Sequence, residues 1–363
     1  MRTRGRGAML AVFLIALLVF GAIWSAWSVT TSIFVPPTNT SNHTITLSIL
    51  QGESTQQIAD DLQTQGLIRN ALAFRLWARI KGLDTTLEAG VYILTPGMTI
   101  DQIIARLQNG QPDEKQLVVI EGYRLEQIAN AGSQSGLTRF DKQKFLDYVK
   151  HPETFPDRAN YPILQEIPQG QNMEGLLFPD TYQAPVNADA VKVIDIMLDK
   201  FTQVEKDNNL VAKAKQIGLT EYQMVILASI IQREAGRVVA DMPLVASVYW
   251  NRIEKPNAET KSILNADPTV QYARDTDTPP AKYWGPLNDS GGNIDPGSLW
   301  NTYKHPGWPP TPISSPGLQA LLAAASPAQT NYYFFLSKKD GHNVYTDTYA
   351  KFLQLQQQYP PTQ

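Results

Sequence analysis

The chain of 363 residues contains no cysteine. This absence excludes disulfides, thiol nucleophiles and thiolate metal sites. Histidine is also scarce, because the sequence has four, which are far apart and show no ligand spacing: His43, His151, His305 and His342. We therefore expect neither a metal site nor a cofactor.

Charge of either sign is low in this sequence. The net charge is −3, and no long run of lysine and arginine supplies a local basic patch. Nucleic acid is therefore not an expected partner. The apolar fraction of 43% and the charged fraction of 18% are typical of a globular protein. A chain of this length can hold two or three modest domains in addition to an anchor.

One long uncharged segment stands near the N-terminus, at residues 8–29, and three arginines precede it. About 20 apolar residues suffice to cross a bilayer, and Trp24 and Trp27 suit its far interface. The alternative is a cleaved signal peptide, but the run is longer than a usual signal core and lacks a small-x-small cleavage site. We expect a single transmembrane helix in the cell membrane, with the rest of the chain outside the cytoplasm.

A weak repeat follows the polar, proline-bearing spacer at residues 30–44. Three apolar or β-branched runs each lead to a glycine, and a Gln-Ile pair follows five and six residues later; the glycines are Gly52, Gly97 and Gly122. Ser54 with Gln57 and Thr99 with Gln102 make capping boxes for the first two helices. The pattern predicts three units of strand, glycine turn and short helix, with a further helix at residues 74–82 between the first two.

The second half of the chain predicts a mixed α+β architecture. Residues 187–217 and 220–236 read as helices, and Thr220 with Gln223 forms a capping box at the start of the second one. A third helix begins near Asp241, which offers a capping side chain. Residues 255–317 are rich in Pro, Gly, Asn and Asp, and such a stretch is unusual in a compact domain unless it lines a site. A helix, two short strands and a closing helix complete the chain.

Glu234 is a carboxylate on the apolar face of a predicted helix. Counting back by three, four, seven and eight residues gives a buried stripe: Ile231, Ile230, Leu227 and Ile226. Burial and a position in the last helical turn both disfavour the anion, so we expect the pKa of this carboxyl to be raised. A carboxylic acid that keeps its proton near neutral pH can serve as a general acid for a glycosidic oxygen.

Two alternatives to that interpretation stay open. Glu234 could instead be a helix-end carboxylate that pairs with Arg233 or Arg237, or that turns out to water. An ordinary glycosidase also needs a second carboxylate about 5 to 10 Å away. Asp241, Asp267 and Asp180 are the candidates, and each has a structural explanation as a helix cap, an Asx-turn or a turn residue.

Seven segments, in their order and spacing, resemble the membrane-anchored endolytic murein transglycosylases of the YceG-like or MltG type over residues 8–357. They are IEGYRLEQIA at 120–129, EGLLFPDTY at 174–182, LASIIQREAG at 227–236, VASVYWNRI at 245–253, NADPTVQYA at 265–273, WNTY at 300–303 and PPTPISSPGLQAL at 309–321. The resemblance implies a LysM-like module, a lytic transglycosylase domain and Glu234 as the acid and base. The expected divisions are 1–29 tail and anchor, 30–44 linker, 45–112 LysM-like module, 113–185 connecting α+β subdomain and 186–357 catalytic domain.

The reaction that the resemblance implies needs a single carboxyl group. The 6-hydroxyl of the muramyl sugar attacks its own C1, so the substrate supplies the nucleophile and effective molarity carries part of the barrier. The enzyme would cut MurNAc–GlcNAc bonds within peptidoglycan strands, leave 1,6-anhydromuramyl ends and terminate glycan elongation. Peptidoglycan synthases are candidate partners. Two other functions stay open: an anchored, non-catalytic wall-binding scaffold, and a two-carboxylate glycan hydrolase.

Neutral hydrogen-bonding side chains are the expected substrate contacts. The candidates are Gln271, Tyr272, Asn301, Thr302, Tyr303 and Asn251, of which five lie in the irregular region. Tryptophans could stack on sugar faces or pack in the core: Trp250, Trp284, Trp300 and Trp308. The final hairpin departs from the family pattern because His342 stands one position early, and this leaves the role of that histidine open.

Overall fold

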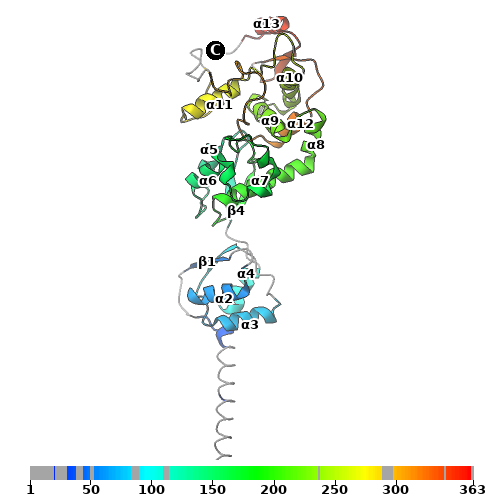
Figure 1. The fold of residues 1–363 in the computed structure, drawn as a ribbon. Coiled ribbons are helices and arrows are strands. Elements are labelled where there is room, and N and C mark those ends of the chain that lie inside the picture. The colour runs from blue at the N-terminus through cyan, green and yellow to red at the C-terminus, as the bar shows by residue number, and fades with distance from the viewer. Residues whose placement is uncertain are drawn as a thin grey trace, which may run out of the picture. The chain divides into compact units, whose positions relative to one another are not determined.

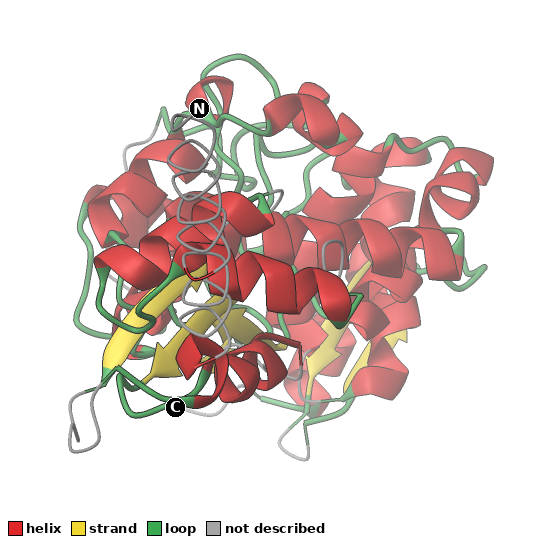
Figure 2. Cartoon of the chain, turned by 90° about the horizontal axis from the view of Figure 1, so that it is seen from below, coloured by secondary structure: helices red, strands yellow, loops and turns green. Residues whose placement is uncertain are grey.

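The computed structural model describes residues 20, 31–37, 44–49, 53–82, 90–108, 114–235, 238–287, 297–338 and 341–360 (Figure 1). The chain divides into two compact units, which are residues 1–114 with 185–187, and residues 115–184 with 188–363. Figure 2 shows that helices form most of the regular structure and that the strands are short. The α+β class is confirmed.

The first unit is a two-stranded sheet with three helices. Strand β1 (Ile45–Ile49) pairs antiparallel with β2 (Gly90–Leu94), and Leu47 lies opposite Tyr92. The helices are α2 (Thr55–Thr64), α3 (Ala71–Ile80) and α4 (Ile100–Gln108). Ser54 caps α2 and Thr99 caps α4 through the predicted boxes with the glutamine three residues on. These contacts confirm the strands and helices of the first two units and the helix between them, whereas the turn at Gly52 lies outside the described residues.

The predicted anchor at residues 8–29 falls, apart from Phe20, outside the described residues. Within the part of the chain that the structure describes, no helix is both long and apolar enough to cross a membrane. The anchor, the LysM-like character of the first unit and the five-segment division of the chain therefore stay predictions.

The second unit begins with the third strand–turn–helix unit. Strand β3 (Glu114–Val118) pairs with β4 (Thr181–Pro185), and α5 (Leu125–Gln134) follows β3. The remaining elements are α6 (Lys142–Lys150), the 3₁₀ turns η1 (Pro152–Thr154), η2 (Arg158–Asn160) and η3 (Pro162–Gln165), α7 (Ala190–Asn208), α8 (Leu210–Gln216), α9 (Glu221–Ala235), η4 (Val239–Asp241), α10 (Met242–Glu254), α11 (Asp267–Asp277), α12 (Leu318–Ala325), β5 (Phe334–Ser337), β6 (Asn343–Thr346) and α13 (Tyr349–Gln358).

Helix α9 is the centre of the second unit, because α8, α10, α11 and α12 all pack against it. Its first turn is capped as predicted, since Thr220 Oγ1 accepts from the Gln223 amide at 3.1 Å and Gln223 Oε1 accepts from the Thr220 amide at 3.0 Å. Nearly every α9 side chain from Tyr222 to Gln232 is buried, including the predicted stripe. A helix that is apolar on all sides is stable when other helices surround it.

Two predictions about this unit were wrong in detail. Residues 187–217 form two helices, because Asn209 adopts a left-handed backbone conformation with φ of 51° between α7 and α8. Residues 255–317 contain a regular helix, α11. Its sequence lacks clear hydrophobic periodicity, but Pro268 stands in its first turn, where the missing amide hydrogen costs nothing.

Candidate active site

Glu234 meets a tyrosine from the neighbouring helix in the last turn of α9. Tyr249, on α10, is 1% exposed, and its phenol donates a 2.7 Å hydrogen bond to Oε1 of Glu234. No described residue supplies a hydrogen-bond partner for Oε2. The carboxyl group is therefore fixed through one oxygen and keeps the other available.

The carboxyl group of Glu234 lines a cavity of about 540 Å³ whose two sides differ in chemistry. One side is polar and comes mainly from α9, α10, the start of α11 and the loop before α12: Glu234, Tyr249, Arg252, Asn265, Asp267 and Tyr303. The other side is mainly aromatic and apolar and comes from β5 and α13: Phe334, Phe335, Leu336, Ser337, Tyr349, Phe352 and Gln356. A sugar offers both hydroxyl groups and apolar ring faces, and such a cavity suits both.

Burial raises the pKa of the Glu234 carboxyl to about 7, and the negative charge of Asp267 raises it as well. The hydrogen bond from Tyr249 and the positive charges of Arg252 and Arg233 act in the opposite direction. Desolvation is the largest of these effects, as the sequence predicted. A carboxyl group with a pKa in this range still holds a proton in part of the molecules at neutral pH, which suits a general acid.

Asp267 is a second carboxylate in the same cavity. It is the first residue of α11, and Tyr303 donates a hydrogen bond from its phenol to Oδ1 of Asp267 at 2.5 Å. Burial and this contact raise the pKa of Tyr303, so the phenol keeps its proton. The position of Asp267 in the cavity goes beyond the turn role considered for it from the sequence.

Arg252 holds the polar side of the cavity together. It lies on α10, three residues after Tyr249 and therefore on nearly the same helix face. Its Nε donates to the carbonyl of Tyr333 at 2.7 Å, and its Nη1 donates to the carbonyl of Leu264. These bonds attach α10 to the residues before β5 and to the loop before α11, so the arginine fixes two segments that carry cavity residues.

Of the six predicted substrate contacts, Tyr303 lines the cavity and the other five do not. The amide of Asn251 donates to the carbonyls of Thr330 and Tyr332 at 3.0 and 2.9 Å. This placement follows from helix geometry, because Asn251 stands two positions after Tyr249, and a step of two residues turns its side chain to nearly the opposite face of α10. Asn251 thus fastens α10 to the segment before β5.

The other four predicted contacts also have partners within the fold. Gln271 Nε2 donates to the carbonyl of Gly285 at 3.0 Å. Thr302 Oγ1 accepts from the amide of Ala266 at 3.1 Å. Asn301 Oδ1 accepts from the amide of Tyr303 at 3.3 Å. Thr302 therefore holds the backbone just before Asp267, and Asn301 holds the backbone of Tyr303.

Tyr272, the last of the predicted contacts, belongs to a buried cluster. The charged members of this cluster come from the segments IEGYRLEQIA at 120–129 and EGLLFPDTY at 174–182. The phenol of Tyr272 donates to Glu174 Oε2 at 3.3 Å, and Glu174 Oε1 accepts from the amide of Leu125 at 3.2 Å. Arg124 donates to the Tyr272 carbonyl at 3.3 Å and to the Thr276 hydroxyl at 2.6 Å. Burial raises the pKa of Glu174, whereas the charge of Arg124 lowers it. The cluster joins the start of α5 to α11 and so supports the helix that carries Asp267.

The remaining carboxylate candidates lie outside the cavity. Asp241 precedes α10, but its side chain does not cap that helix and instead accepts from the amide of Asn343 at 2.8 Å. Its helical backbone conformation, with ψ of −19°, differs from the extended conformation of a capping residue. Asp180 accepts from the amide of Thr181 at 2.7 Å and pairs with Lys200 at 2.9 Å, which agrees with a turn role.

The four tryptophans considered for sugar stacking are partly buried and pack against the main core. Trp250 donates to the carbonyl of Ile217 at 3.1 Å, and Trp300 donates to Thr311 Oγ1 at 3.1 Å. They therefore follow the core interpretation. Among the described residues, no group of three or more His, Asp and Glu side chains is placed to hold a metal ion.

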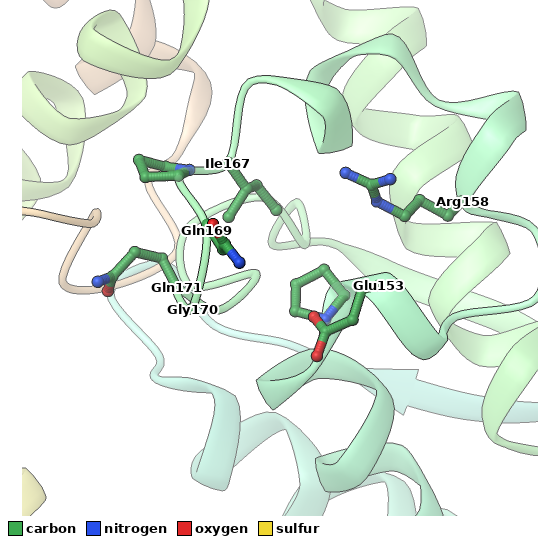
Figure 3. A pocket seen from close by; sticks show the side chains of 8 residues that line it. Glu153, Arg158, Ile167, Gln169, Gly170 and Gln171 are labelled. Atoms are coloured by element: carbon green, nitrogen blue, oxygen red, sulfur yellow. The ribbon is translucent and has the colours of Figure 1, made fainter.

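A second cavity of about 410 Å³ lies between η1, η2 and the loop at residues 167–171. Figure 3 shows the guanidinium of Arg158 and the carboxylate of Glu153 on two sides of it. Arg158 Nη2 donates to the carbonyl of Leu164 at 3.1 Å, so this side chain also holds η3. The cavity contains none of the predicted site residues, and we therefore assign the candidate active site to the cavity of Glu234.

Sequence reasoning missed most of the cavity wall. Tyr249 and Arg252 stand in the segment VASVYWNRI at 245–253, and their spacing of three residues on the helix that follows Glu234 is the signal that could have indicated them. The aromatic side comes from β5 and α13, far along the chain from Glu234. No local pattern indicates that these elements approach α9.

Comparisons with known proteins agree over most of the chain. The model of the YceG-like family matches residues 47–358. A Bacillus subtilis (strain 168) protein named endolytic murein transglycosylase is 29% identical over 340 residues, which cover 90% of this chain and 88% of the relative. A Streptococcus pneumoniae (serotype 2, strain D39) protein of the same name is 30% identical over 369 residues, which cover 92% of this chain and 62% of the relative.

A solved structure gives the same result for the fold. The crystal structure of a protein described as yceG-like, from Listeria monocytogenes, superimposes with a TM-score of 0.55 at 30% sequence identity. The match covers 87% of this chain and 100% of that chain. The chain thus resembles these proteins over both of its units, although it spans only 62% of the length of the pneumococcal relative.

Proposed function

The chain belongs to the YceG-like family, and from this premise we propose that it is an endolytic murein transglycosylase in which Glu234 is the catalytic acid and base. The observation that carries the assignment of Glu234 is its position in the cavity with a pKa raised to about 7 and one oxygen held by Tyr249. A non-catalytic scaffold has no need for a desolvated acid in an open cavity.

In the proposed reaction Glu234 first donates a proton to the substrate and then accepts one from it. Protonated Glu234 gives the proton on Oε2 to the glycosidic oxygen as the bond between C1 of the muramyl sugar and that oxygen breaks. The 6-hydroxyl of the same sugar forms a bond to C1, and the carboxylate takes its proton. The products are a strand with a 1,6-anhydromuramyl end and a strand with a new free hydroxyl group, and the acid is regenerated.

The cavity offers partners for the charge that develops at C1. The carboxylate of Asp267 supplies negative charge close to Glu234, and the phenol of Tyr303 holds that carboxylate in place. Preorganised charge of this kind stabilises a cationic transition state more than it stabilises the ground state. The aromatic side, with Tyr349 and Phe352 stacked at 6.1 Å, suits the apolar face of a sugar ring.

The remaining parts of the proposal concern location. The uncharged segment at residues 8–29, with arginines before it, supports a single-pass anchor and a catalytic unit outside the cytoplasm. The strand–turn–helix units of the first compact unit support a LysM-like module. Peptidoglycan strands are the substrate, and peptidoglycan synthases are the proposed partners, since an enzyme anchored at the membrane meets strands as they are made.

The test of this function is the identity of the ends that the protein makes. The wild-type protein is incubated with polymeric, uncrosslinked glycan, and the fragments are analysed by mass spectrometry. We expect internal cleavage and anhydromuramyl ends, which are lighter by one water molecule than hydrolysis products. Glu234→Gln should lose about 100- to 10,000-fold of this activity, as is typical when a general acid is removed. A Glu234→Gln protein with substantial activity would contradict the assignment.

The position of Asp267 supports a second candidate function, that of a two-carboxylate glycan hydrolase. A hydrolase that uses two carboxylates needs them in one cavity, and Glu234 and Asp267 meet that requirement. Incubation in isotopically labelled water separates the two functions, because a hydrolase places a solvent oxygen at the new reducing end and a lytic transglycosylase does not. Labelled reducing ends would make the protein a hydrolase.

A further inference from the structure

Helix α3 of the first unit carries apolar side chains on its outer surface. Leu72, Leu76 and Ile80 are 48%, 43% and 72% exposed. They are spaced four residues apart and therefore form one continuous stripe along the helix. The opposite face of α3, which includes Phe74 and Ala78, is buried in the core of the unit. Folding of the unit thus leaves the stripe exposed, and core packing does not account for it.

Positive charge borders this stripe on one side. Residues 69–82 contain four basic side chains and no acidic ones. Lys81 pairs with Asp101 of α4 at 3.1 Å. Arg75 and Arg79, which flank the stripe on one side, have no ion-pair partner among the described residues. An exposed apolar stripe flanked by unpaired arginines is typical of a helix that lies in the surface of an anionic membrane.

The segment that follows the predicted anchor is attached to this same helix. Ile33 is buried in the core of the first unit, and the ring of Phe34 contacts the edge of Trp77 on α3 with 5.6 Å between ring centroids. Arg69 donates to the carbonyl of Pro37 at 3.0 Å. Phe34 follows the end of the uncharged segment by only five residues, which reach at most about 18 Å. A spanning helix at residues 8–29 would therefore hold α3 close to the bilayer surface.

We propose that the stripe of Leu72, Leu76 and Ile80 docks into the outer surface of the bilayer, with Arg75 and Arg79 against anionic lipid headgroups. The inference rests on the proposed anchor, and it adds a second, peripheral membrane contact to it. Trp77 and Phe34 lie beside the stripe, and aromatic rings favour the interface between headgroups and hydrocarbon. The first unit is then held on the membrane surface by one helix in addition to its tether.

The absence of cysteine from the natural chain makes a direct test possible. The full-length variants Leu76→Cys and Ile80→Cys are labelled with an environment-sensitive fluorophore and reconstituted into phosphatidylglycerol-containing liposomes. Gln56→Cys, at an exposed position on α2, is the matched control. We expect iodide in the water to quench the labels at 76 and 80 at least about fivefold less than the label at 56. Nitroxide-bearing lipids should quench the labels at 76 and 80 and leave the label at 56 unaffected.

The outcomes separate the docking from the anchor. A protein that does not float with the liposomes overturns the anchor and, with it, this inference. A protein that floats, but whose labels at 76 and 80 are quenched by iodide as strongly as the control, overturns the docking alone. Protection that disappears when the protein is diluted in the bilayer would assign the stripe to a second copy of the chain and would also overturn it.

The contribution of charge is measured in the same liposomes. Protection of the label at 80 from iodide gives the ratio of membrane-bound to free helix. Arg75→Gln and Arg79→Gln should each lower this ratio by about fivefold in anionic liposomes. The same substitutions should have little effect in liposomes made of phosphatidylcholine alone. An equal effect in both kinds of liposome would show that the arginines do not contact anionic headgroups.

Discussion

The phenol of Tyr249 donates a 2.7 Å hydrogen bond to Oε1 of Glu234. The bond orients the carboxyl group toward the cavity, and it also stabilises the anion, because it lowers the pKa of Glu234 against the larger effect of burial. Two opposing effects therefore set the pKa of Glu234. Desolvation raises it and favours the protonated acid, whereas the Tyr249 phenol and the nearby arginines lower it and favour release of the proton.

Tyr249→Phe removes this hydrogen bond and preserves the ring. The pKa of Glu234 should rise, so the alkaline limb of kcat/KM should move to higher pH by about one unit, while the maximal rate falls because the carboxyl group is no longer oriented. Tyr222→Phe is the matched control, since that buried phenol has no hydrogen-bond partner among the described residues. A shifted profile in the control, or an unshifted one in Tyr249→Phe, would contradict this role.

The environment of Glu234 was predictable from the sequence because it depends on local geometry. Helical periodicity placed Ile226, Leu227, Ile230 and Ile231 beside it, and α9 buries all four. The Thr220–Gln223 capping box likewise fixed the start of the helix. Burial alone then gave the direction of the pKa shift. Each of these inferences uses residues within a few helical turns of one another.

The rest of the cavity depends on contacts between elements that are distant in the sequence. Asp267 lies at the start of α11, a helix that the sequence did not predict because its hydrophobic periodicity is weak. The aromatic side of the cavity comes from β5 and α13. Asn251 and Tyr272 have side chains of suitable chemistry, but helix geometry and a buried cluster direct them to partners within the fold. Residue type predicted binding at these positions, and only tertiary packing decides which side chains face the cavity.

Asp267→Asn tests the second carboxylate. Its charge raises the pKa of Glu234, so its removal should lower that pKa and move the alkaline limb of kcat/KM to lower pH. Because the same charge is proposed to stabilise the cation that develops at C1, turnover below the shifted limb should also fall, by roughly 10- to 1000-fold. Asp180→Asn, which lies outside the cavity, controls for the loss of a carboxylate. An unshifted limb would contradict the electrostatic effect of Asp267 on Glu234, whereas solvent oxygen at the reducing ends made by the wild type would support the hydrolase.

Tyr303 and Asn301 should respond differently to substitution. Tyr303 is half-exposed, and Tyr303→Phe removes its hydroxyl from the cavity, so turnover should fall roughly 10- to 1000-fold with little change in Tm. Asn301→Ala removes the acceptor for the Tyr303 amide from a buried position, so it should lower the free energy of unfolding by about 1–2 kcal/mol. Parallel measurements of kcat and Tm check both expectations. Equal losses of Tm in the two variants would make Tyr303 a structural residue.

The proposed topology predicts where the C-terminus lies. Three arginines before the uncharged segment should keep the N-terminus in the cytoplasm and place everything after residue 29 outside. A reporter enzyme that works only outside the cytoplasm should therefore be active when it is fused after Gln363. A fused reporter that requires the cytoplasm provides the reciprocal control, and its activity would contradict the anchor.

Glu234→Gln should change how the stability of the protein depends on pH. The pKa of Glu234 is about 7 in the folded protein, against an ordinary value of 4.5, so between these values the folded state holds a proton that the unfolded state releases. The free energy of unfolding of the wild type therefore falls as pH rises through this window, and glutamine removes this contribution. The free energy of unfolding of the variant should therefore exceed that of the wild type by an amount that grows between pH 4.5 and 7 to about 1–3 kcal/mol and stays constant above pH 7.

Glu221, whose pKa is raised to about 8, is present in both proteins, so its contribution cancels in the comparison. Urea unfolding of the two proteins across this range measures the difference, and identical pH dependence would show that Glu234 titrates as an ordinary surface carboxylate.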